Sequence, residues 1–266
     1  MKLCASNLGW KMENNDLVFT AMEKCGYTGL EIAPTKFFPE NPYDHAKDMK
    51  AIANSIYEKH GLKICSMQSI WFGKSGLVFG EKTERESLFD YTKKAMDFAA
   101  AIDCKNLVFG CPKPRNIPDD MPKEKADEII EEFFGGLADY AASVGVLLAM
   151  EANPTIYNTN FLNETAQAIE MVRKLNRPGL SVNLDIGTMV QNEESAEVLA
   201  GNAGVISHTH FSEPYIKPLQ KRNLHGEVVD TLMKQNYEGY FSVEIADANP
   251  VDEVIESIKY IGTLEI

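Results

Sequence analysis

Short apolar runs alternate with longer amphipathic stretches along the whole chain. The runs are rich in β-branched and aromatic side chains and are too short to be helices, so each is typical of a buried strand. We therefore predict strands at residues 2–6, 28–33, 62–68, 106–111, 146–151, 180–185, 205–211 and 240–245.

The stretches between these runs carry helical periodicity. In residues 83–103, apolar side chains recur every three or four positions, and Thr83 with Glu86 is expected to form an N-terminal capping box. Residues 122–143 begin with Pro122 and carry acidic side chains early, as the start of a helix prefers. We predict helices at about 16–25, 44–60, 83–103, 122–143, 163–176, 194–202, 224–236 and 250–262. Four glycines that favour a left-handed helix end are Gly26, Gly61, Gly145 and Gly179.

Eight strand–helix units follow one another without a change of composition or a Pro- or Ser-rich linker. About 250 residues is a usual length for a closed parallel barrel. An open, doubly wound sheet is the main alternative, but residues 6–15 after the first strand lack the glycine-rich phosphate loop of that fold. We predict an α/β protein in which residues 1–266 form a single (β/α)8 TIM-barrel domain.

Side-chain alternation indicates which face of the barrel wall each strand residue occupies. In three strands the apolar side chains share one face, and the smaller or more polar ones share the other, which ends in Glu151, Asp185 or Glu244. The apolar faces are expected to pack against the outer helices. In the strand at 205–211, the inward side chains are expected to be Ile206, His208 and His210.

The carboxyl ends of barrel strands meet at one mouth, where the catalytic groups of such barrels lie. Clustered carboxylates repel each other and stay protonated unless a positive charge neutralises them. Three carboxylates and one imidazole suit Mn²⁺, which we expect first, and also Mg²⁺, Co²⁺ or Zn²⁺. A solvated strand end is the alternative for any one of these residues alone. We expect one divalent metal ion to be held by Glu151, Asp185, His210 and Glu244.

The order of these groups resembles the xylose-isomerase-like TIM-barrel superfamily of sugar and sugar-phosphate isomerases and epimerases. The segments that carry the resemblance are LLAMEANP, NLDIGT, ISHTHFSEP and HGEVVDTLMKQNYEGYFSVEI. Residues 29–32 are also similar to the second strand of that family. The resemblance spans essentially the whole chain, and it implies a TIM barrel, a carbohydrate substrate and the same four metal ligands.

In the ketose 3-epimerase branch of this family, two glutamates also face opposite sides of the substrate carbon. The resemblance therefore implies that Glu151 and Glu244 act as the acid and the base. A metal ion near the carbonyl stabilises the enediolate that forms when the adjacent proton leaves. Return of a proton to the opposite face gives inversion, whereas return to the same face with carbonyl transposition gives an aldose–ketose isomerase.

The sequence departs from ketose epimerases at residues that hold substrate hydroxyls. Thr188 stands where those enzymes usually carry a histidine, Tyr157 replaces a glutamate, and Ile216 replaces an arginine. We therefore expect a substrate other than a free ketohexose. A metal-dependent lyase or dehydratase that acts on an oxo-sugar or related acid through the same enolate is an alternative.

Several further residues are candidates for the site. We expect substrate contacts from Gln68, Thr188 and Glu213, although solvated or packed side chains are the alternative for each. Glu31 is expected to touch either the substrate or a neighbouring strand. His208 is expected to be a hydrogen-bonded core histidine below His210. The remaining histidines, expected at the surface, are His45, His60 and His225.

The 266 residues include 26 basic and 39 acidic side chains, which gives a formal net charge of −13. No run of five basic residues is present, so we expect neither a nucleic-acid partner nor an anionic membrane partner. The DNA-repair endonuclease branch of the family uses a three-zinc cluster with several extra histidines. The chain has five histidines in all, which argues against that branch.

Five cysteines are scattered without a CxxC pair, so we expect reduced, mostly packed thiols. The first ten residues lack the apolar segment of a signal peptide. No stretch approaches the roughly 18 uninterrupted apolar residues of a membrane span. We expect a cytoplasmic protein, and a homo-oligomer is compatible with this kind of barrel.

These features predict a metal-dependent isomerase or epimerase of a sugar or sugar-like carbonyl compound, working by proton transfer through an enediolate. The alternative from outside enzymology is a catalytically silent barrel that serves as a sugar-binding or scaffold subunit.

Overall fold

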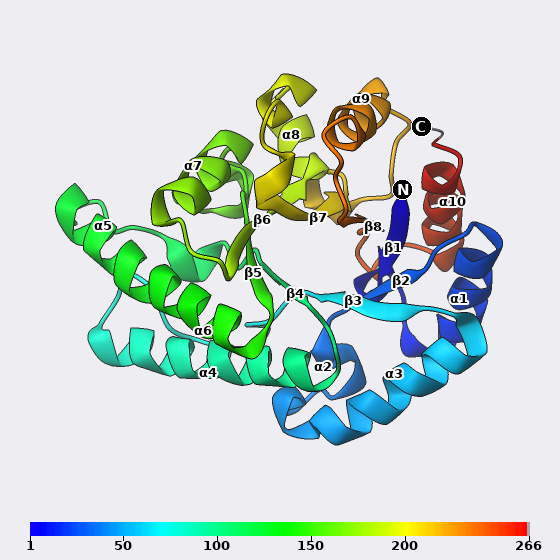
Figure 1. The fold of residues 1–266 in the computed structure, drawn as a ribbon, viewed down its shortest axis with the longest axis horizontal. Coiled ribbons are helices and arrows are strands. Elements are labelled where there is room, and N and C mark those ends of the chain that lie inside the picture. Colours follow the sequence, from blue (N-terminus) through cyan, green and yellow to red (C-terminus); the bar gives the residue numbers. More distant parts are fainter. Residues whose placement is uncertain (265–266) are drawn as a thin grey trace.

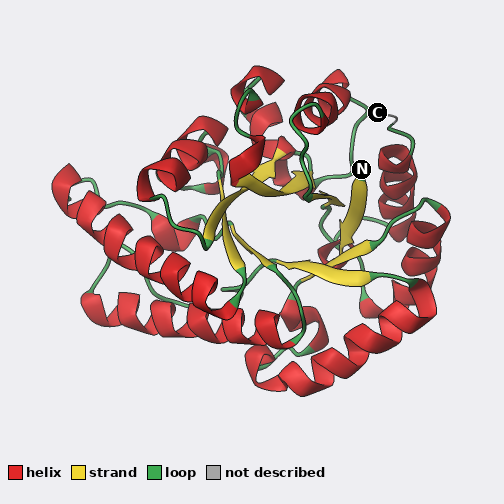
Figure 2. Cartoon of the chain, viewed as in Figure 1, coloured by secondary structure: helices red, strands yellow, loops and turns green. Residues whose placement is uncertain are grey.

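A computed structural model describes residues 1–264 and contains a closed barrel of eight parallel strands (Figures 1 and 2). Figure 2 shows the ring of strands surrounded by helices. Each strand pairs with the next along the chain, and β8 pairs with β1. The predicted (β/α)8 TIM barrel is therefore confirmed. The strands are β1 Lys2–Ser6, β2 Gly29–Ile32, β3 Lys63–Met67, β4 Asn106–Phe109, β5 Leu147–Glu151, β6 Leu180–Asp185, β7 Ile206–Phe211 and β8 Tyr240–Val243.

Helices connect the strands on the outside of the barrel (Figure 1). They are α1 Asn15–Lys24, α2 Pro34–Phe37, α3 Ala46–His60, α4 Lys82–Ala101, α5 Lys123–Ile130, α6 Gly136–Val144, α7 Thr165–Leu175, α8 Ile186–Gln191, α9 Asn223–Met233 and α10 Val251–Gly262. The predicted helix that begins after Pro122 is present as α5 and α6, joined by a π-helical turn at Glu131–Gly135. The short α2 was not predicted.

Two helix starts differ from the prediction. The capping box of α4 is formed by Glu81 and Glu84 rather than by Thr83, because the Glu81 carboxylate accepts the backbone hydrogen bond. The helix predicted at 194–202 is present only as a short 3-10 helix at Ala196–Leu199. Instead, α8 begins directly after Asp185, whose carboxylate caps the first turn, so no loop separates β6 from its helix.

The four glycines after helices serve two different purposes. Gly179 does not have the predicted left-handed backbone, and a Cβ there would lie 2.0 Å from the backbone oxygen of Ala138. Glycine is therefore needed at that position for the close approach of β6 to α6. Left-handed backbone is confirmed at the other three, with φ of 76°, 69° and 73° at Gly26, Gly61 and Gly145.

A β-bulge between β6 and β7 changes the alternation of the seventh strand. The Ser207 hydroxyl lies 2.7 Å from the Ser181 hydroxyl and donates to Asn106 at 2.6 Å, inside the barrel. Ile206 instead pairs with Val182 and belongs to the apolar core. Its predicted inward position is wrong, because the extra residue of the bulge shifts its side chain to the other face.

The apolar faces of the strands pack against the helices as the alternation predicts. Buried outward side chains include Leu148, Met150, Val182, Leu184, Phe241 and Val243. Among residues 1–264, no helix has the length and apolar character needed to cross a bilayer.

Candidate metal centre

Four strand ends bring three carboxylates and an imidazole together at the C-terminal mouth of the barrel. Glu151 ends β5, Asp185 ends β6, His210 is the penultimate residue of β7, and Glu244 follows β8 directly. The backbone N–H of Glu244 donates to Phe211 O at 2.9 Å, so the strand pairing continues past β8. The structure therefore places all four predicted ligands at the same end of the barrel.

The imidazole lies in the middle of the group. His210 Nδ1 is 3.2 Å from an oxygen of Glu151 and 3.2 Å from an oxygen of Glu244. Potential ligand atoms of Glu151, Asp185 and His210 all lie within 4.8 Å of one another. His210 is fully buried, while Glu151 and Glu244 are each 8% exposed. The group is thus compact and largely shielded from water.

The crowding of these groups shifts their pKa values. Burial and the nearby charges of Glu151 and Glu244 raise the pKa of Asp185 to about 7. Burial alone would raise the pKa of Glu151, but the hydrogen bond and charge of His210 lower it. Burial alone would lower the pKa of His210, but Glu244 and Glu31 raise it well above its usual range. Protons thus help to neutralise the crowded carboxylates, a task that a divalent cation can take over.

The donor set fits such a cation. Three carboxylates and one imidazole, with no thiolate, match the preferences of Mn²⁺, Mg²⁺, Co²⁺ and Zn²⁺. Glu151, Asp185 and Glu244 line a cavity of about 200 Å³ that His210 underlies. The residues present can therefore hold one divalent ion at the floor of a small cavity.

Neighbouring groups hold the Asp185 carboxylate in place. It accepts hydrogen bonds from the Thr188 N–H at 2.8 Å and from the Ser212 hydroxyl. The Thr188 hydroxyl lies 2.7 Å from Asp185 Oδ2 and 2.9 Å from Ala152 O. Thr188 is fully buried and engaged with the protein on both sides. These bonds to the protein do not test the predicted contact of Thr188 with a substrate, which stays a prediction.

Three residues that support Glu151 were missed by the sequence reasoning. Asn183 and Asn153 donate to its two oxygens at 2.6 and 2.9 Å. Asn153 in turn accepts from the fully buried guanidinium of Arg115 at 2.8 Å. Gly110 leaves room for the same carboxylate, because a Cβ there would lie 2.5 Å from Glu151 Oε2. Asn183 shares the inward face of its strand with Asp185, so strand alternation could have indicated its place near the site. Arg115 lies in a loop, where no such pattern exists.

Gln68 and Glu213 both line the cavity. The Gln68 amide donates to Ser6 Oγ at 2.8 Å and to Glu31 at 3.2 Å, which fixes its orientation. Glu213 accepts two hydrogen bonds from Arg222, at 2.7 and 2.6 Å. Both side chains are placed at the mouth as expected, and their substrate contacts stay predictions.

A second group of potential ligands lies deeper in the barrel and comprises Glu31, His208 and His210. Each histidine has its Nε2 3.1 Å from Glu31 Oε1. Gln68 and Ser242 also donate to Glu31, each at 3.2 Å. The Glu31 carboxylate is thus surrounded by hydrogen-bond donors, which makes it an acceptor within a polar network rather than a second metal site. His208 is buried, as predicted.

The surface prediction for the other histidines is wrong in two cases. His225 is fully buried, and its ring centroid lies 5.2 Å from that of Phe211 and 5.7 Å from that of Tyr260. It begins the inward stripe of α9, at helical spacing with the buried Val228, Val229 and Leu232. The His60 side chain is only 6% exposed, whereas that of His45 is 41% exposed, as expected.

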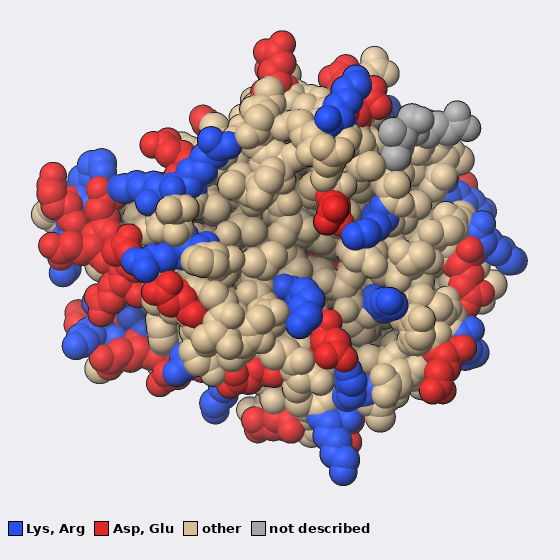
Figure 3. Space-filling model, in the orientation of Figure 1, with Lys and Arg blue, Asp and Glu red and all other residues tan. Residues whose placement is uncertain are grey.

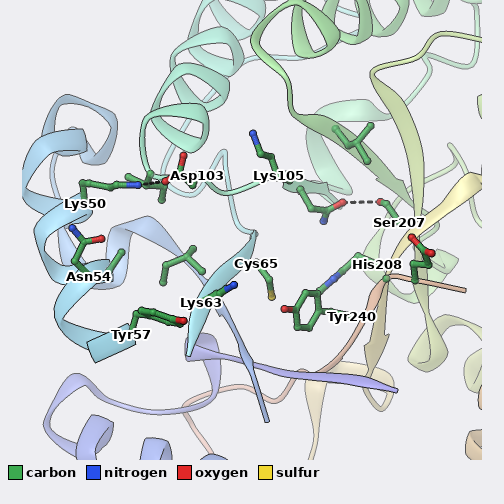
Figure 4. Close-up of a pocket in the computed structure, with 17 residues that line it drawn as sticks. Lys50, Asn54, Tyr57, Lys63, Cys65, Asp103, Lys105, Ser207, His208 and Tyr240 are labelled. Carbon is green, nitrogen blue, oxygen red and sulfur yellow. Dashed lines mark hydrogen bonds and ion pairs between the residues drawn. The ribbon is translucent and has the colours of Figure 1, made fainter. Parts of the chain in front are cut away.

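A larger cavity, of about 560 Å³, lies at the opposite end of the barrel, where the strands begin (Figure 4). Lys63 and Tyr240 line it at the starts of β3 and β8, together with Tyr57 of α3 and with His208. Within residues 1–264, its lining contains no cluster of metal-binding groups. The larger cavity is therefore not the candidate for metal chemistry.

Acidic and basic side chains are interspersed on the face of the molecule shown in Figure 3.

Comparison with known proteins places this geometry in context. A model of the family described as xylose isomerase-like TIM barrel matches residues 19–264. No curated protein matches the sequence. At the identities given below, the likeness to solved structures shows the fold alone.

Three solved structures illustrate that likeness. Apo 3-keto-D-glucoside 4-epimerase from E. coli aligns over 99% of both chains, with 18% identity and a TM-score of 0.77. D-psicose 3-epimerase from Clostridium cellulolyticum H10, with D-tagatose, aligns over 100% of both chains, with 15% identity and a TM-score of 0.76. IolI protein with a bound zinc atom aligns over 98% of this chain and 96% of its own, with 18% identity and a TM-score of 0.72.

Proposed function

The chain belongs to the xylose isomerase-like TIM barrel family, and we propose that it is a divalent-metal-dependent isomerase or epimerase of a sugar or sugar-like carbonyl compound. The observation that carries the proposal is the close grouping of Glu151, Asp185 and His210 at the mouth, with Glu244 3.2 Å from His210. The likeness to structures described as sugar epimerases supports a carbohydrate substrate. We propose Mn²⁺ as the first choice of ion, because an oxygen-rich ligand set with one imidazole suits it.

The two glutamates are proposed to move the protons. When bound, the divalent ion supplies positive charge that offsets the negative charge developing on the substrate oxygens. Glu151 and Glu244 reach the cavity from β5 and β8, which are separated by β6 and β7. One carboxylate accepts the proton from the carbon beside the carbonyl, and the other returns a proton to the opposite face. Asn183 and Asn153 hold Glu151 in position during this exchange.

The lining of the cavity favours an uncharged substrate. Among residues 1–264, the lining includes no lysine or arginine. A phosphate or carboxylate on the substrate would therefore meet several carboxylates, whose negative charge a single divalent ion offsets only in part. Apolar side chains in the cavity lining are Leu8, Val108 and Ile216. We propose an unphosphorylated sugar or oxo-sugar. The four carboxylates in the lining belong to Glu151, Asp185, Glu213 and Glu244.

Deuterium exchange from heavy water tests the proposal. The Mn²⁺-loaded protein is incubated with neutral ketoses, with 3-oxo-glycosides and with phosphorylated ketoses, and NMR follows both exchange and products. We expect exchange beside the carbonyl of a neutral compound, together with formation of an isomer or epimer. Loss of water or of an aglycone would favour the lyase alternative. Exchange confined to phosphorylated compounds would contradict an uncharged substrate.

The Glu244→Gln variant is the control for a silent barrel. It keeps the shape of the side chain and removes the proton acceptor. If no compound exchanges faster with the wild type than with this variant, the barrel binds or scaffolds without catalysing, and the proposed function is wrong.

A further inference from the structure

Glu31 of β2 lies directly beneath the imidazole of the candidate metal centre. Its oxygens are 3.1 and 3.0 Å from His210 Nε2. The other nitrogen of that ring, Nδ1, faces Glu151 and Glu244 at 3.2 Å. The imidazole is therefore held between a buried carboxylate on one side and the cavity carboxylates on the other. Glu31 itself is fully buried.

The surroundings of Glu31 explain how a carboxylate can be buried there. His208 Nε2 lies 3.1 Å away, and Gln68 Nε2 and Ser242 Oγ each donate at 3.2 Å. Gln68 and Ser242 donate from the end of β3 and from β8, and His210 faces the carboxylate from β7, so the carboxylate joins strands around the barrel. A buried charge is tolerated when donors satisfy it in this way. The same donors occupy its lone pairs, which leaves Glu31 an acceptor of hydrogen bonds.

We propose that Glu31 is a positioning residue for the metal centre, which accepts the Nε2 proton of His210 and so directs the Nδ1 lone pair toward the ion. This inference rests on the proposed metal site. A ligating imidazole has two nitrogens, and the hydrogen bond made by one of them sets which nitrogen can bind the metal. Among the hydrogen bonds of residues 1–264, Glu31 is the acceptor that faces His210 Nε2.

The length and charge of Glu31 both enter this role. A glutamine would present an amide N–H group to surroundings that already supply donors from Gln68 and Ser242. An aspartate would keep the charge but lie one methylene farther from the ring. We therefore expect Glu31→Gln to disturb the imidazole more than Glu31→Asp does.

Calorimetric titration with Mn²⁺ tests the proposal on the folded protein. Loss of the group behind a metal-ligating histidine costs about 10–100-fold in metal affinity, so we expect that increase in Kd for Glu31→Gln. Glu31→Asp should recover part of the affinity. The matched control is Ser242→Ala, which removes one hydrogen bond from the same carboxylate and none from the imidazole. It should leave the Mn²⁺ affinity close to that of the wild type.

The outcomes separate this inference from the function on which it rests. If the wild type binds no Mn²⁺, both the metal site and the role of Glu31 are wrong. If the wild type binds Mn²⁺ and a folded Glu31→Gln variant binds it equally well, only the role of Glu31 is wrong. An equal loss of affinity in Ser242→Ala would show a general loosening of the network, and it would also overturn the role.

Wild-type protein provides a second test in case Glu31→Gln fails to fold. Nitrogen-15 NMR of histidine-labelled protein loaded with Zn²⁺ reports which ring nitrogen carries the proton. We expect His210 to be protonated at Nε2 and bound to Zn²⁺ at Nδ1. Zn²⁺ at Nε2, or an Nε2 without a proton, would overturn the proposal.

Discussion

The two ends of the barrel differ in chemistry, although the same strands build both. The C-terminal end has the smaller cavity, about 200 Å³, with four carboxylates in its lining. The N-terminal end has the larger one, about 560 Å³, with two tyrosines and three lysines, one of them paired with Asp103. Convergence of ionisable groups that shift one another's pKa values, rather than cavity size, identifies the candidate site.

The largest expected effect is on proton exchange. Glu244→Gln removes a general acid or base, so exchange at saturating Mn²⁺ should fall about 10²–10⁴-fold. Lys63→Gln, a matched change of a charged side chain at the other end, should leave the exchange rate unchanged. NMR measurement of deuterium uptake compares the two. Similar losses in both variants would remove the distinction between the ends.

A metal ion bound at the C-terminal mouth should stabilise the folded protein, and no ion is expected to bind at the other end. At 100 times its Kd, an ion that binds only the folded protein raises the free energy of unfolding by about 2.7 kcal/mol. Urea denaturation with and without Mn²⁺ measures this change. Asp185→Asn should abolish the gain, because it removes one ligand. An undiminished gain in that variant would place the ion elsewhere.

One buried histidine that belongs to neither end, His225, should lose its contribution to stability in acid. Burial lowers the pKa of His225 to about 4, below the usual value of about 6.5. Between these values the unfolded chain binds a proton that the folded protein does not, so stability falls as the pH drops. The contribution of His225 to the free energy of unfolding should fall by about 2 kcal/mol between pH 7 and pH 5. Asp185 works in the opposite direction over this range, because its raised pKa lets the folded protein take up a proton there, so the His225 effect is read from the difference between wild type and variant.

Urea denaturation at the two pH values measures the acid effect. His225→Gln cannot take up the proton, so its loss of stability over the same range should be smaller by a similar amount. If the variant and the wild type lose equally, His225 is not the source of the acid sensitivity.

A pair of glycines gives the finest comparison. A Cβ on Gly110 would lie 2.5 Å from Glu151 Oε2, whereas a Cβ on Gly29 would lie 2.6 Å from the Tyr240 ring. Gly110→Ala should displace the flexible end of Glu151 and slow exchange about tenfold. Gly29→Ala should lower the free energy of unfolding by about 1–3 kcal/mol and leave Mn²⁺ affinity unchanged. Exchange measurements, urea denaturation and titration with Mn²⁺ compare the two variants. Slower exchange in Gly29→Ala with unchanged exchange in Gly110→Ala would contradict this comparison.

The barrel was predictable because its signal is repeated in every unit. The eight apolar runs match the eight strands, and their ends differ from the prediction by no more than two residues. Alternation within the strands also predicted the inward face for Glu151, Asp185, His210 and Glu244, and their position at the carboxyl ends of the strands predicted the end of the barrel that would carry them. These inferences depend on backbone periodicity, which the sequence carries directly.

The errors occurred where local geometry interrupts that periodicity. The bulge at Ser207 reverses the side of Ile206, and the cap by Asp185 starts α8 without a loop. The role of Arg115 depends on a long side chain that folds back from a loop to reach Asn153. No spacing rule encodes that contact, because it is set by the tertiary structure.

The central claim is that four strand-end side chains hold one divalent ion. Titration of metal-free wild-type protein with Mn²⁺, followed by electron paramagnetic resonance of the free ion, tests it most directly. The account predicts one bound ion per chain, with binding lost in Asp185→Asn. An absence of binding by the wild type, or equal binding by the variant, would contradict it.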